Sequence, residues 1–339
     1  MKKYVKLLMS VIGACVMLTL GRQYVFAEHW EKVEDKWCYL QESQEPVTGW
    51  KNLDGRWFYF YEDGTMAKST WIGASYVGAG GAREANTVVD GKDIGADGKT
   101  QDLFLGDAKF IAHRGLSSNQ PENTRDAFQW AGLNGFWGVE CDVWITADGQ
   151  YAILHDQSLQ RVFGVNENVT DITMAEAQAH RLAEGGIETF SDVTMLSLDE
   201  YLSIVEDFPS LHPVIELKMD CTQEQLTEIM GMVEAHGLTK RAYVISFLKE
   251  NLELLRSLYP DLSIQLLTGA MDDANLEWCI ANNANISAID GALTPETVKK
   301  YKDKGIHVAA WTIDDKSRAL ELIYDYGVEY VTTNTRLFE

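Results

Sequence analysis

Basic residues are few in this sequence. Its 339 residues include 29 lysines and arginines against 51 aspartates and glutamates, which gives a formal net charge of −22. Proteins that bind nucleic acid carry clustered positive charge, and an acidic surface is repelled by anionic membranes. The composition therefore argues against a nucleic-acid partner, although a metal ion or a local arginine can still hold an anion.

Cysteine is also scarce. One of the five cysteines, Cys15, lies in an N-terminal apolar run, and the others are widely and irregularly spaced: Cys38, Cys141, Cys221 and Cys279. No Cys-x-x-Cys pair occurs, so the sequence offers neither a common zinc motif nor a redox motif. A domain of this size does not require disulfides, and we expect buried free thiols.

No apolar run is long enough to span a membrane. The longest, Leu7–Leu20, has fourteen residues, whereas a transmembrane helix needs about 20. Three lysines precede it and Val25-Phe26-Ala27 follows it, which is the pattern of an export signal. We therefore predict a signal peptide at residues 1–27 and a secreted protein with no membrane span after cleavage. Lipoprotein attachment through Cys15 is the less favoured alternative, because the most apolar part of the run follows that cysteine.

A glycine-rich phosphate loop is missing too, so a nucleotide-binding sheet has no support. Instead, strand-like and helix-like patterns alternate after Asp107. We predict strands near residues 110–113, 138–144, 213–217, 242–247, 262–267, 286–290, 307–312 and 328–332, and helices near 124–133, 198–206, 222–236, 249–258, 272–283, 295–304 and 315–326. This alternation favours an α/β fold, a (β/α)8 TIM barrel over residues 101–339, rather than an open sheet.

The region before the barrel is repetitive. Aromatic positions recur with a period of twenty residues, so that Trp30, Trp37 and Tyr39 return as Trp50, Trp57 and Tyr59. Asp63-Gly64 is a tight-turn signal, and each unit is predicted to be a short hairpin. A partial third unit spans 71–78, and a degenerate fourth lies within 89–99. We therefore predict a small N-terminal β-hairpin repeat module with a linker over residues 28–100, in which stacking provides the core.

These units resemble the cell-wall-binding, or choline-binding, repeats of surface proteins in Gram-positive bacteria. The match lies in Thr48-Gly49-Trp50 and Gly55-Arg56-Trp57-Phe58-Tyr59. In such repeats aromatic rings cage a quaternary ammonium, to which they are attracted through cation–π interactions. The resemblance implies that Trp50, Trp57 and Tyr59 bind choline or a cell-wall polymer. Packing of the hairpins is the alternative role of these rings.

Charged residues stand at predicted strand ends, where a barrel has its active site. Residues two apart in a strand share a face, so Glu140 lies beside Asp142, and Glu216 beside Lys218. Three carboxylates in one cavity would repel one another unless a cation bound them. An all-oxygen ligand set suits Mg²⁺ or Ca²⁺ better than zinc. For either pair alone, a solvated charge at the barrel rim is the simpler interpretation.

Two histidines are expected at the same barrel mouth. His113 ends the first strand and precedes Arg114, and His155 follows a short strand at 151–154. One basic and one protonated histidine fit the acid–base cleavage of a phosphodiester. An arginine beside them suits an anionic substrate, because its guanidinium can bind phosphate oxygens in a bidentate manner.

The region from about Phe110 to Phe338 resembles the glycerophosphodiester phosphodiesterase family. The resemblance rests on ordered motifs: His113-Arg114-Gly115, Pro121-Glu122-Asn123-Thr124, Glu140-x-Asp142, Thr146-x-Asp148-Gly149, His155-Asp156-x-x-Leu159-x-Arg161, Glu216-x-Lys218, Ser246-Phe247 and Trp311-Thr312. It implies one divalent metal ion, Ca²⁺ or Mg²⁺, held by Glu140, Asp142 and Glu216. It implies His113 as general base and His155 as general acid. It also implies that Arg114 and Lys218 bind phosphate, that Trp311 packs against the glycerol part, and that Glu122 lies at the site.

Two features depart from that family's pattern. Thr333-Asn334 stands where the family usually has Thr-Asp, and Val193-Thr194-Met195-Leu196 where it often has Ile-Pro-Thr-Leu. We expect neither to touch the metal or proton-transfer residues, and so expect an effect on substrate preference rather than on activity. Some forty residues separate His155 from Leu198, too many for a bare loop. A capping box at Thr173 predicts a helix from Met174, and we predict that this segment caps the site.

The sequence thus predicts a secreted, metal-dependent phosphodiesterase. It would hydrolyse a small glycerophosphodiester to sn-glycerol 3-phosphate and an alcohol. One alternative keeps the barrel but changes the substrate, giving a phospholipase or a teichoic-acid hydrolase. Another is a catalytically inactive wall-binding adhesin, and the intact set of two histidines and three carboxylates speaks against it.

Overall fold

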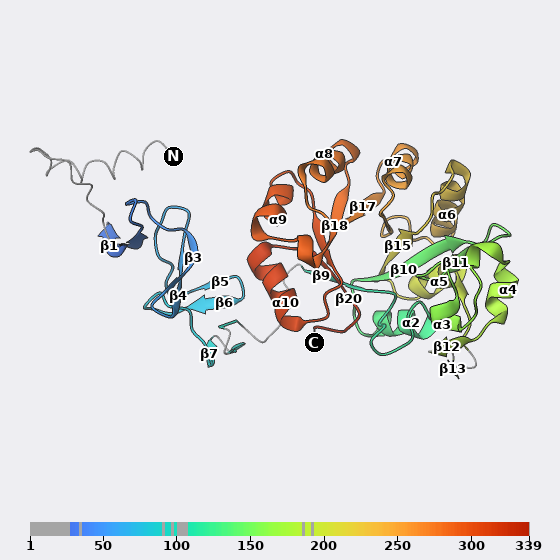
Figure 1. Ribbon diagram of the computed structural model, residues 1–339, viewed down its shortest axis with the longest axis horizontal. Coiled ribbons are helices and arrows are strands. Elements are labelled where there is room, and N and C mark those ends of the chain that lie inside the picture. Colours follow the sequence, from blue (N-terminus) through green and yellow to red (C-terminus); the bar gives the residue numbers. More distant parts are fainter. Residues whose placement is uncertain are drawn as a thin grey trace, which may run out of the picture. The chain divides into compact units, whose positions relative to one another are not determined.

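The structure is a computed structural model that describes residues 28–33, 36–89, 92–95, 98–99, 108–184, 187–190 and 193–338. The predicted signal peptide and the predicted boundary between residues 100 and 101 lie outside these ranges. The chain divides into two compact units (Figure 1). The first unit consists of the chain up to Trp71 together with Ser75–Ala85. The second consists of Ile72–Ala74 and Asn86–Glu339. We call the first unit the hairpin module and residues 108–338 of the second the barrel domain.

The described residues before the barrel form four β-hairpins, as predicted. Their strands are β1 (His29–Val33), β2 (Lys36–Leu40), β3 (Gly49–Leu53), β4 (Arg56–Phe60), β5 (Thr70–Ile72), β6 (Ser75–Val77), β7 (Thr87–Val89) and β8 (Lys92–Ile94). Trp30 lies opposite Tyr39, and Trp50 lies opposite Tyr59 in the same way. Within the hairpin module, the Trp30 ring packs edge-on against Phe58 of the next hairpin, with centroids 5.1 Å apart. Aromatic rings of neighbouring hairpins therefore pack against one another, while Trp30 itself stays 37% exposed and Phe60 is fully buried.

The barrel domain is a closed ring of eight parallel strands, which confirms the predicted (β/α)8 barrel. The strands are β9 (Lys109–Ala112), β10 (Gly138–Ile145), β15 (His212–Leu217), β16 (Tyr243–Ser246), β17 (Ser263–Thr268), β18 (Asn285–Ile289), β19 (Val308–Trp311) and β20 (Tyr330–Thr333). β9 pairs with both β10 and β20, and this pairing closes the ring. Each observed strand overlaps its predicted range.

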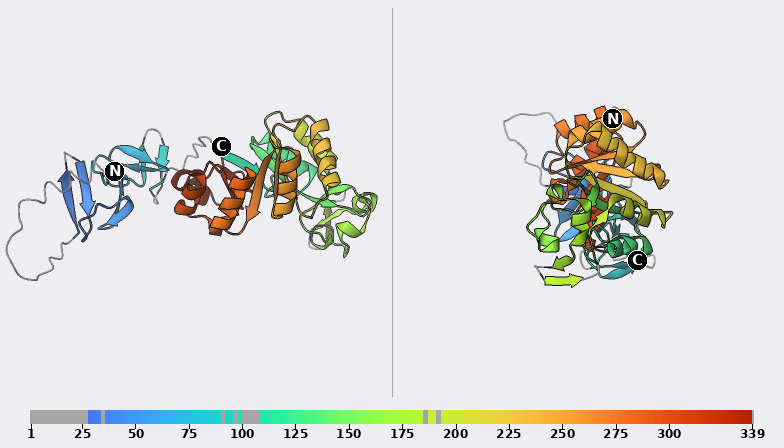
Figure 2. Two further views of the ribbon diagram at one scale, coloured as in Figure 1. Left: turned by 90° about the horizontal axis from the view of Figure 1, so that it is seen from above. Right: turned by 90° about the vertical axis from the view of Figure 1, so that its right-hand side faces the viewer.

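Helices lie outside the strands (Figures 1 and 2). They are α2 (Arg125–Leu133), α5 (Leu198–Glu206), α6 (Gln223–Ala235), α7 (Lys249–Leu258), α8 (Asp273–Asn282), α9 (Pro295–Lys302) and α10 (Lys316–Leu320). A Ser, Thr or Asp side chain caps the N-terminus of all of these except α7, which explains why most begin where they do. The helix predicted over 315–326 is α-helical only to Leu320 and continues as a π-helical segment, η4 (Glu321–Tyr326). Within the described ranges, every helix is too short or too polar to cross a bilayer.

The main core lies between strands and helices. Alternate residues of β10, such as Val139, Cys141 and Val143, are buried in it. A smaller cluster fills the barrel itself and includes Ile111, Val214 and Ile245. The four described cysteines are free thiols; Cys38, Cys141 and Cys279 are buried, as predicted, and Cys221 is half-buried.

Between β10 and β15 the chain leaves the barrel. This excursion comprises β11 (Tyr151–Ile153), α3 (Gln160–Phe163), η2 (Val169–Asp171), α4 (Met174–Ala179), β12 (Leu182–Glu184), β13 (Ile187–Phe190) and β14 (Leu196–Ser197). The predicted capping box is present, with Thr173 and Glu176 at the start of α4. Leu154, Leu159 and Phe163 belong to an apolar cluster separate from the main core. We call residues 154–195 the cap segment.

Candidate active site

Strand register brings the three predicted metal-binding carboxylates together. In the β10–β15 pair, Asp142 lies directly opposite Glu216, and Glu140 precedes Asp142 by two residues on the same face. All three side chains are buried, and one carboxylate oxygen from each lies within 4.8 Å of the others. The sequence prediction that they converge is therefore correct.

This carboxylate cluster fits a divalent cation. Within the described part of the chain, Glu140 Oε1 is buried and has no hydrogen-bond donor, and Asp142 Oδ1 is approached only by the Lys218 ammonium. Burial and the charges of Asp142 and Glu216 raise the pKa of Glu140 well above its usual value. Burial and the charge of Asp142 also raise the pKa of Glu216 to about 7. A buried carboxylate oxygen without a donor, together with two carboxyl groups that resist ionisation, indicates a missing positive charge. Hard oxygen ligands suit Ca²⁺ or Mg²⁺.

Two cationic side chains border the cluster. Lys218 Nζ lies 2.9 Å from Glu216 Oε1 and 3.3 Å from Asp142 Oδ1. Arg114 Nε lies 3.4 Å from Asp142 Oδ2. Burial opposes ionisation of Asp142, but Lys218 and Arg114 outweigh it and hold the pKa of that carboxyl below its usual value. Both residues predicted to bind phosphate are therefore placed beside the candidate metal site.

The backbone of the His-Arg-Gly segment is bent into the site. Arg114 has a φ of +56°, and its N–H donates to Glu140 Oε2 over 2.8 Å. Gly115 follows with a φ of +80° and lies against α2, where a Cβ would be 2.6 Å from the carbonyl carbon of Ala127. Only glycine adopts this conformation and this close approach without strain. The segment thus directs a main-chain donor at the cluster.

His113 is held by the last strand of the barrel. The main-chain N–H of His113 donates to the Thr333 carbonyl oxygen, and the ring nitrogen Nδ1 of His113 lies 2.8 Å from Asn334 Oδ1. Burial and the charge of Arg114 lower the pKa of His113. The expectation that Asn334 does not touch a proton-transfer residue is therefore wrong. Pairing of β20 with β9 sets Thr333 opposite Ala112, which places the following residues side by side.

His155 has a different partner. Its Nδ1 lies 2.7 Å from Asp156 Oδ1. The main-chain N–H of Leu154, the residue before it, donates to the Asp142 carbonyl oxygen over 3.0 Å, which places His155 beside the end of β10. Arg161 from the cap segment donates to Asp156 and to both oxygens of Glu122. Glu122 also accepts from Arg114 over 3.1 Å. His155 is thus linked to a polar network in which Glu122 joins two arginines, whereas the side chain of His113 bonds to Asn334.

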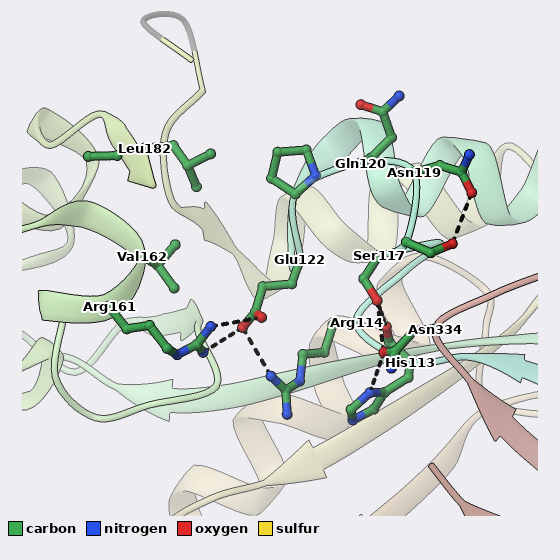
Figure 3. A pocket seen from close by; sticks show the side chains of 13 residues that line it. His113, Arg114, Ser117, Asn119, Gln120, Glu122, Arg161, Val162, Leu182 and Asn334 are labelled. Atoms are coloured by element: carbon green, nitrogen blue, oxygen red, sulfur yellow. Dashed lines mark hydrogen bonds and ion pairs between the residues drawn. The ribbon is translucent and has the colours of Figure 1, made fainter. Parts of the chain in front are cut away.

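A pocket of about 770 Å³ opens beside His113 and Arg114. In Figure 3, Arg161, Val162 and Leu182 of the cap segment lie on one side, with His113, Ser117 and Asn334 on the other and Glu122 between them. The cap segment therefore forms one wall of the pocket. His155, Lys218 and Trp311 are not among the described residues that line it.

Trp311 lies at the carboxyl end of β19. Its indole N–H donates to the Ser287 carbonyl oxygen over 3.0 Å, and its ring meets Phe247 edge-on with centroids 5.8 Å apart. Phe247 follows β16 and is 49% exposed. These rings offer an apolar surface at the same end of the barrel. The predicted contact of Trp311 with glycerol stays a prediction.

Four further residues contact the site although the sequence predicted no role for them there: Asn123, Asp156, Arg161 and Asp314. Asn123 is buried and donates from Nδ2 to Asp142 Oδ2 over 2.9 Å. Asn123, Asp156 and Arg161 belong to motifs shared with the family, and this membership is the sequence feature that could have indicated them. Their partners are set by tertiary structure, which spacing along the chain does not reveal.

Known proteins share these features. The profile of the "Glycerophosphoryl diester phosphodiesterase family" matches residues 113–336. A glycerophosphodiester phosphodiesterase of Bacillus altitudinis is 33% identical over 162 residues, which cover 47% of this chain and 66% of that protein. One from Caldanaerobacter subterraneus subsp. tengcongensis is 28% identical over 234 residues, 66% of this chain and 93% of that protein. Among solved structures, an Oleispira antarctica phosphodiesterase in complex with the product sn-glycerol-3-phosphate is 25% identical with a TM-score of 0.62, covering 68% of this chain and 94% of that one.

Proposed function

The chain belongs to the glycerophosphoryl diester phosphodiesterase family, and we propose that it hydrolyses small glycerophosphodiesters to sn-glycerol 3-phosphate and an alcohol. The observation that carries the proposal is the cluster of three buried carboxylates, with a histidine on either side of β10 along the chain. His113 precedes Arg114, whose N–H donates to Glu140, and His155 follows Leu154, whose N–H donates to the Asp142 carbonyl oxygen. Relatives named for this activity, and a structural neighbour solved with sn-glycerol-3-phosphate, support it.

In the proposed reaction, Glu140, Asp142 and Glu216 hold Ca²⁺ or Mg²⁺. When bound, such an ion polarises the phosphoryl group and neutralises its negative charge. Arg114 and Lys218, which border the cluster, bind the phosphate oxygens. Trp311 provides an apolar face for the glycerol carbons.

His113 and His155 move the protons. Neutral His113 removes a proton from the attacking water as the water oxygen bonds to phosphorus. The bond from phosphorus to the leaving alcohol oxygen breaks, and protonated His155 donates its proton to that oxygen. The lowered pKa of His113 supports its assignment as the base, since it favours the neutral imidazole at pH 7. Asp156 orients His155 through its hydrogen bond.

A substrate panel tests the proposed reaction. Glycerol 3-phosphate release would be measured from glycerophosphocholine, glycerophosphoethanolamine, polyglycerol phosphate and phospholipid vesicles, each with and without Ca²⁺ or Mg²⁺. We expect the small diesters to be hydrolysed fastest. Preference for vesicles or polyglycerol phosphate would instead identify a phospholipase or a teichoic-acid hydrolase. If no diester yields a product with either ion, the remaining alternative is a catalytically inactive wall-binding adhesin.

We also propose that the protein is secreted. Support comes from the basic start, the fourteen-residue apolar run and the small residue at Ala27. Mass spectrometry of the exported protein tests this proposal. The expected mass is that of a mature chain that begins at Glu28. A lipid-modified chain that begins at Cys15 would show lipoprotein attachment instead.

For the hairpin module, we propose binding of choline or a cell-wall polymer at the rings of Trp50, Trp57 and Tyr59. Trp50 and Tyr59 pack together with centroids 5.4 Å apart. The guanidinium carbon of Arg83 lies 5.7 Å from the Trp50 centroid and 5.6 Å from the Trp57 centroid. A quaternary ammonium must therefore displace a cation that the chain itself supplies.

We predict that Arg83→Ala tightens choline binding by about 5–30-fold, because cation–π contacts at exposed rings contribute about 0.5–1 kcal/mol each. The measurement is a tryptophan fluorescence titration of the secreted full-length protein with choline. Arg56→Ala is the matched control, since Arg56 is exposed on β4 next to Trp57 and points to the other face. Unchanged affinity in Arg83→Ala would show that choline does not displace Arg83 from these rings. No binding in either protein would show that the rings only pack the hairpins.

A further inference from the structure

We infer that Asn334, oriented by Asp314, fixes the tautomer of His113, so that Nδ1 carries the proton and Nε2 presents its lone pair. Asn334 and Asp314 are thus positioning residues for the general base. The inference rests on the proposed function, which assigns that role to His113. Its physical part concerns the hydrogen-bond network alone.

The amide of Asn334 has one permitted orientation. Its Nδ2 lies 2.7 Å from Asp314 Oδ2, and its main-chain nitrogen lies 2.7 Å from Asp314 Oδ1. An ionised carboxylate only accepts hydrogen bonds, so the NH₂ group of Asn334 must face Asp314. The amide oxygen, Oδ1, must then point the other way, toward His113 and the Ser117 hydroxyl.

This orientation decides where the proton sits on His113. Asn334 Oδ1 is an acceptor 2.8 Å from His113 Nδ1, so Nδ1 must be the donor. A neutral imidazole has one N–H, and therefore Nε2 holds the lone pair. In its neutral form His113 can take up a proton only at Nε2, the nitrogen that is free of this network.

The two histidines also differ in the chemical nature of the group that accepts a hydrogen bond from Nδ1. His155 Nδ1 bonds to the Asp156 carboxylate, whereas His113 Nδ1 bonds to an amide. A carboxylate adds an attraction for a charged imidazolium that an amide lacks. Asn334 thus orients His113 as Asp156 orients His155. Its hydrogen bond also favours the protonated ring, but it adds no charge of its own to that preference. A neutral partner suits a base, and a charged partner suits an acid.

The substitution Asp314→Asn reverses the direction of the hydrogen bonds from residue 314 through Asn334 to His113. The main-chain N–H of Asn334 and the Thr333 hydroxyl keep the oxygen of the new side chain at the position of Oδ1, so its NH₂ group faces Asn334. The Asn334 amide must then flip and present its NH₂ group to His113 Nδ1. Neutral His113 is left with its proton on Nε2. We expect kcat to fall by about 10²–10³-fold with KM changed less than about threefold, as for a base in the wrong tautomer.

The double variant D314N/N334D is the matched control. Its carboxylate at position 334 accepts from the new amide at position 314 and from His113 Nδ1, which restores the original direction of the hydrogen bond to the histidine. We expect its kcat to return to within about tenfold of the wild type. Asp314 is exposed, so its replacement removes no core side chain, and thermal unfolding midpoints check that both variants fold.

Imidazole ¹⁵N chemical shifts provide a readout that is independent of activity. We expect the Nδ1–H tautomer of His113 in the wild type and the double variant, and the Nε2–H tautomer in D314N. Wild-type kcat in D314N, or an unchanged tautomer, would overturn the inference. A wild-type protein that cleaves no diester would refute the proposed function, while the ¹⁵N measurement would still test the network.

Discussion

Removal of divalent cations is expected to abolish diester hydrolysis, and Ca²⁺ or Mg²⁺ is expected to restore it. Glu140, Asp142 and Glu216 are buried together, and Glu140 Oε1 has no donor among the described residues. A bound ion stabilises transition-state charge by several kcal/mol, so we expect a loss on the order of 10³-fold. Full activity after exhaustive chelation would refute the metal site.

Substitutions test the same site without relying on turnover. Glu140→Gln and Asp142→Asn should each weaken Ca²⁺ or Mg²⁺ binding by about tenfold or more in calorimetric titrations. Glu206→Gln is the control, because Glu206 ends α5 and so lies toward the opposite end of the barrel. Affinities equal to the wild type in both site variants would place the metal elsewhere.

The metal-free protein should also respond to pH. Folding raises the pKa of Glu140 and brings that of Glu216 to about 7. Between about pH 4.5 and 7, the folded state thus binds more protons at these groups than the unfolded state. Their contribution to stability is favourable below this window and is lost as pH rises through it. Adding the metal should remove this dependence, which thermal unfolding in chelator and in Ca²⁺ can measure.

The second large loss of activity is expected when either proposed proton-transfer histidine is replaced. His113→Ala and His155→Ala should each lower kcat by about 10²–10⁴-fold, the usual range for a lost acid or base. The pH–rate profile of the wild type should be bell-shaped. Because the pKa of His113 lies below its ordinary value, activity should rise with pH through a limb below about pH 6.5.

Each variant should flatten one limb of that profile. His113→Ala should remove the acidic limb, and His155→Ala the alkaline one. His180→Ala is a suitable control, because His180 is bonded to Glu167 on the cap segment and does not contact the proposed reacting groups. Near wild-type rates in both site variants would mean that the acid and the base are other residues.

Much of the barrel could be predicted from the sequence because each strand and helix is a local pattern. The two-residue spacing of Glu140 and Asp142 fixes their common face whatever the tertiary structure. The carboxylate cluster follows once β10 and β15 are neighbours, and consecutive strands of a barrel are neighbours. These parts of the site therefore follow from residue spacing and fold class together.

Other contacts depend on distant pairing. Asn334 meets His113 only because β20 closes the barrel against β9, across 221 residues of chain. The position of Arg83 over Trp50 and Trp57 likewise depends on how one hairpin packs against another. The π-helical segment after Leu320 gives no periodic signal distinct from that of an α-helix. Local spacing carries no information on any of these three.

The cap segment leaves and rejoins the barrel at one edge, since β10 pairs directly with β15 although the whole excursion separates them in sequence. It has an apolar cluster separate from the main core and contributes Val162, Leu182 and Ala183 to the pocket wall. Its length and composition can therefore change during evolution without disturbing strand register or the carboxylate cluster. For enzyme engineering, residues 154–195 can therefore be exchanged with the least disturbance of the barrel, provided that Asp156 and Arg161, which bond beside His155, are kept.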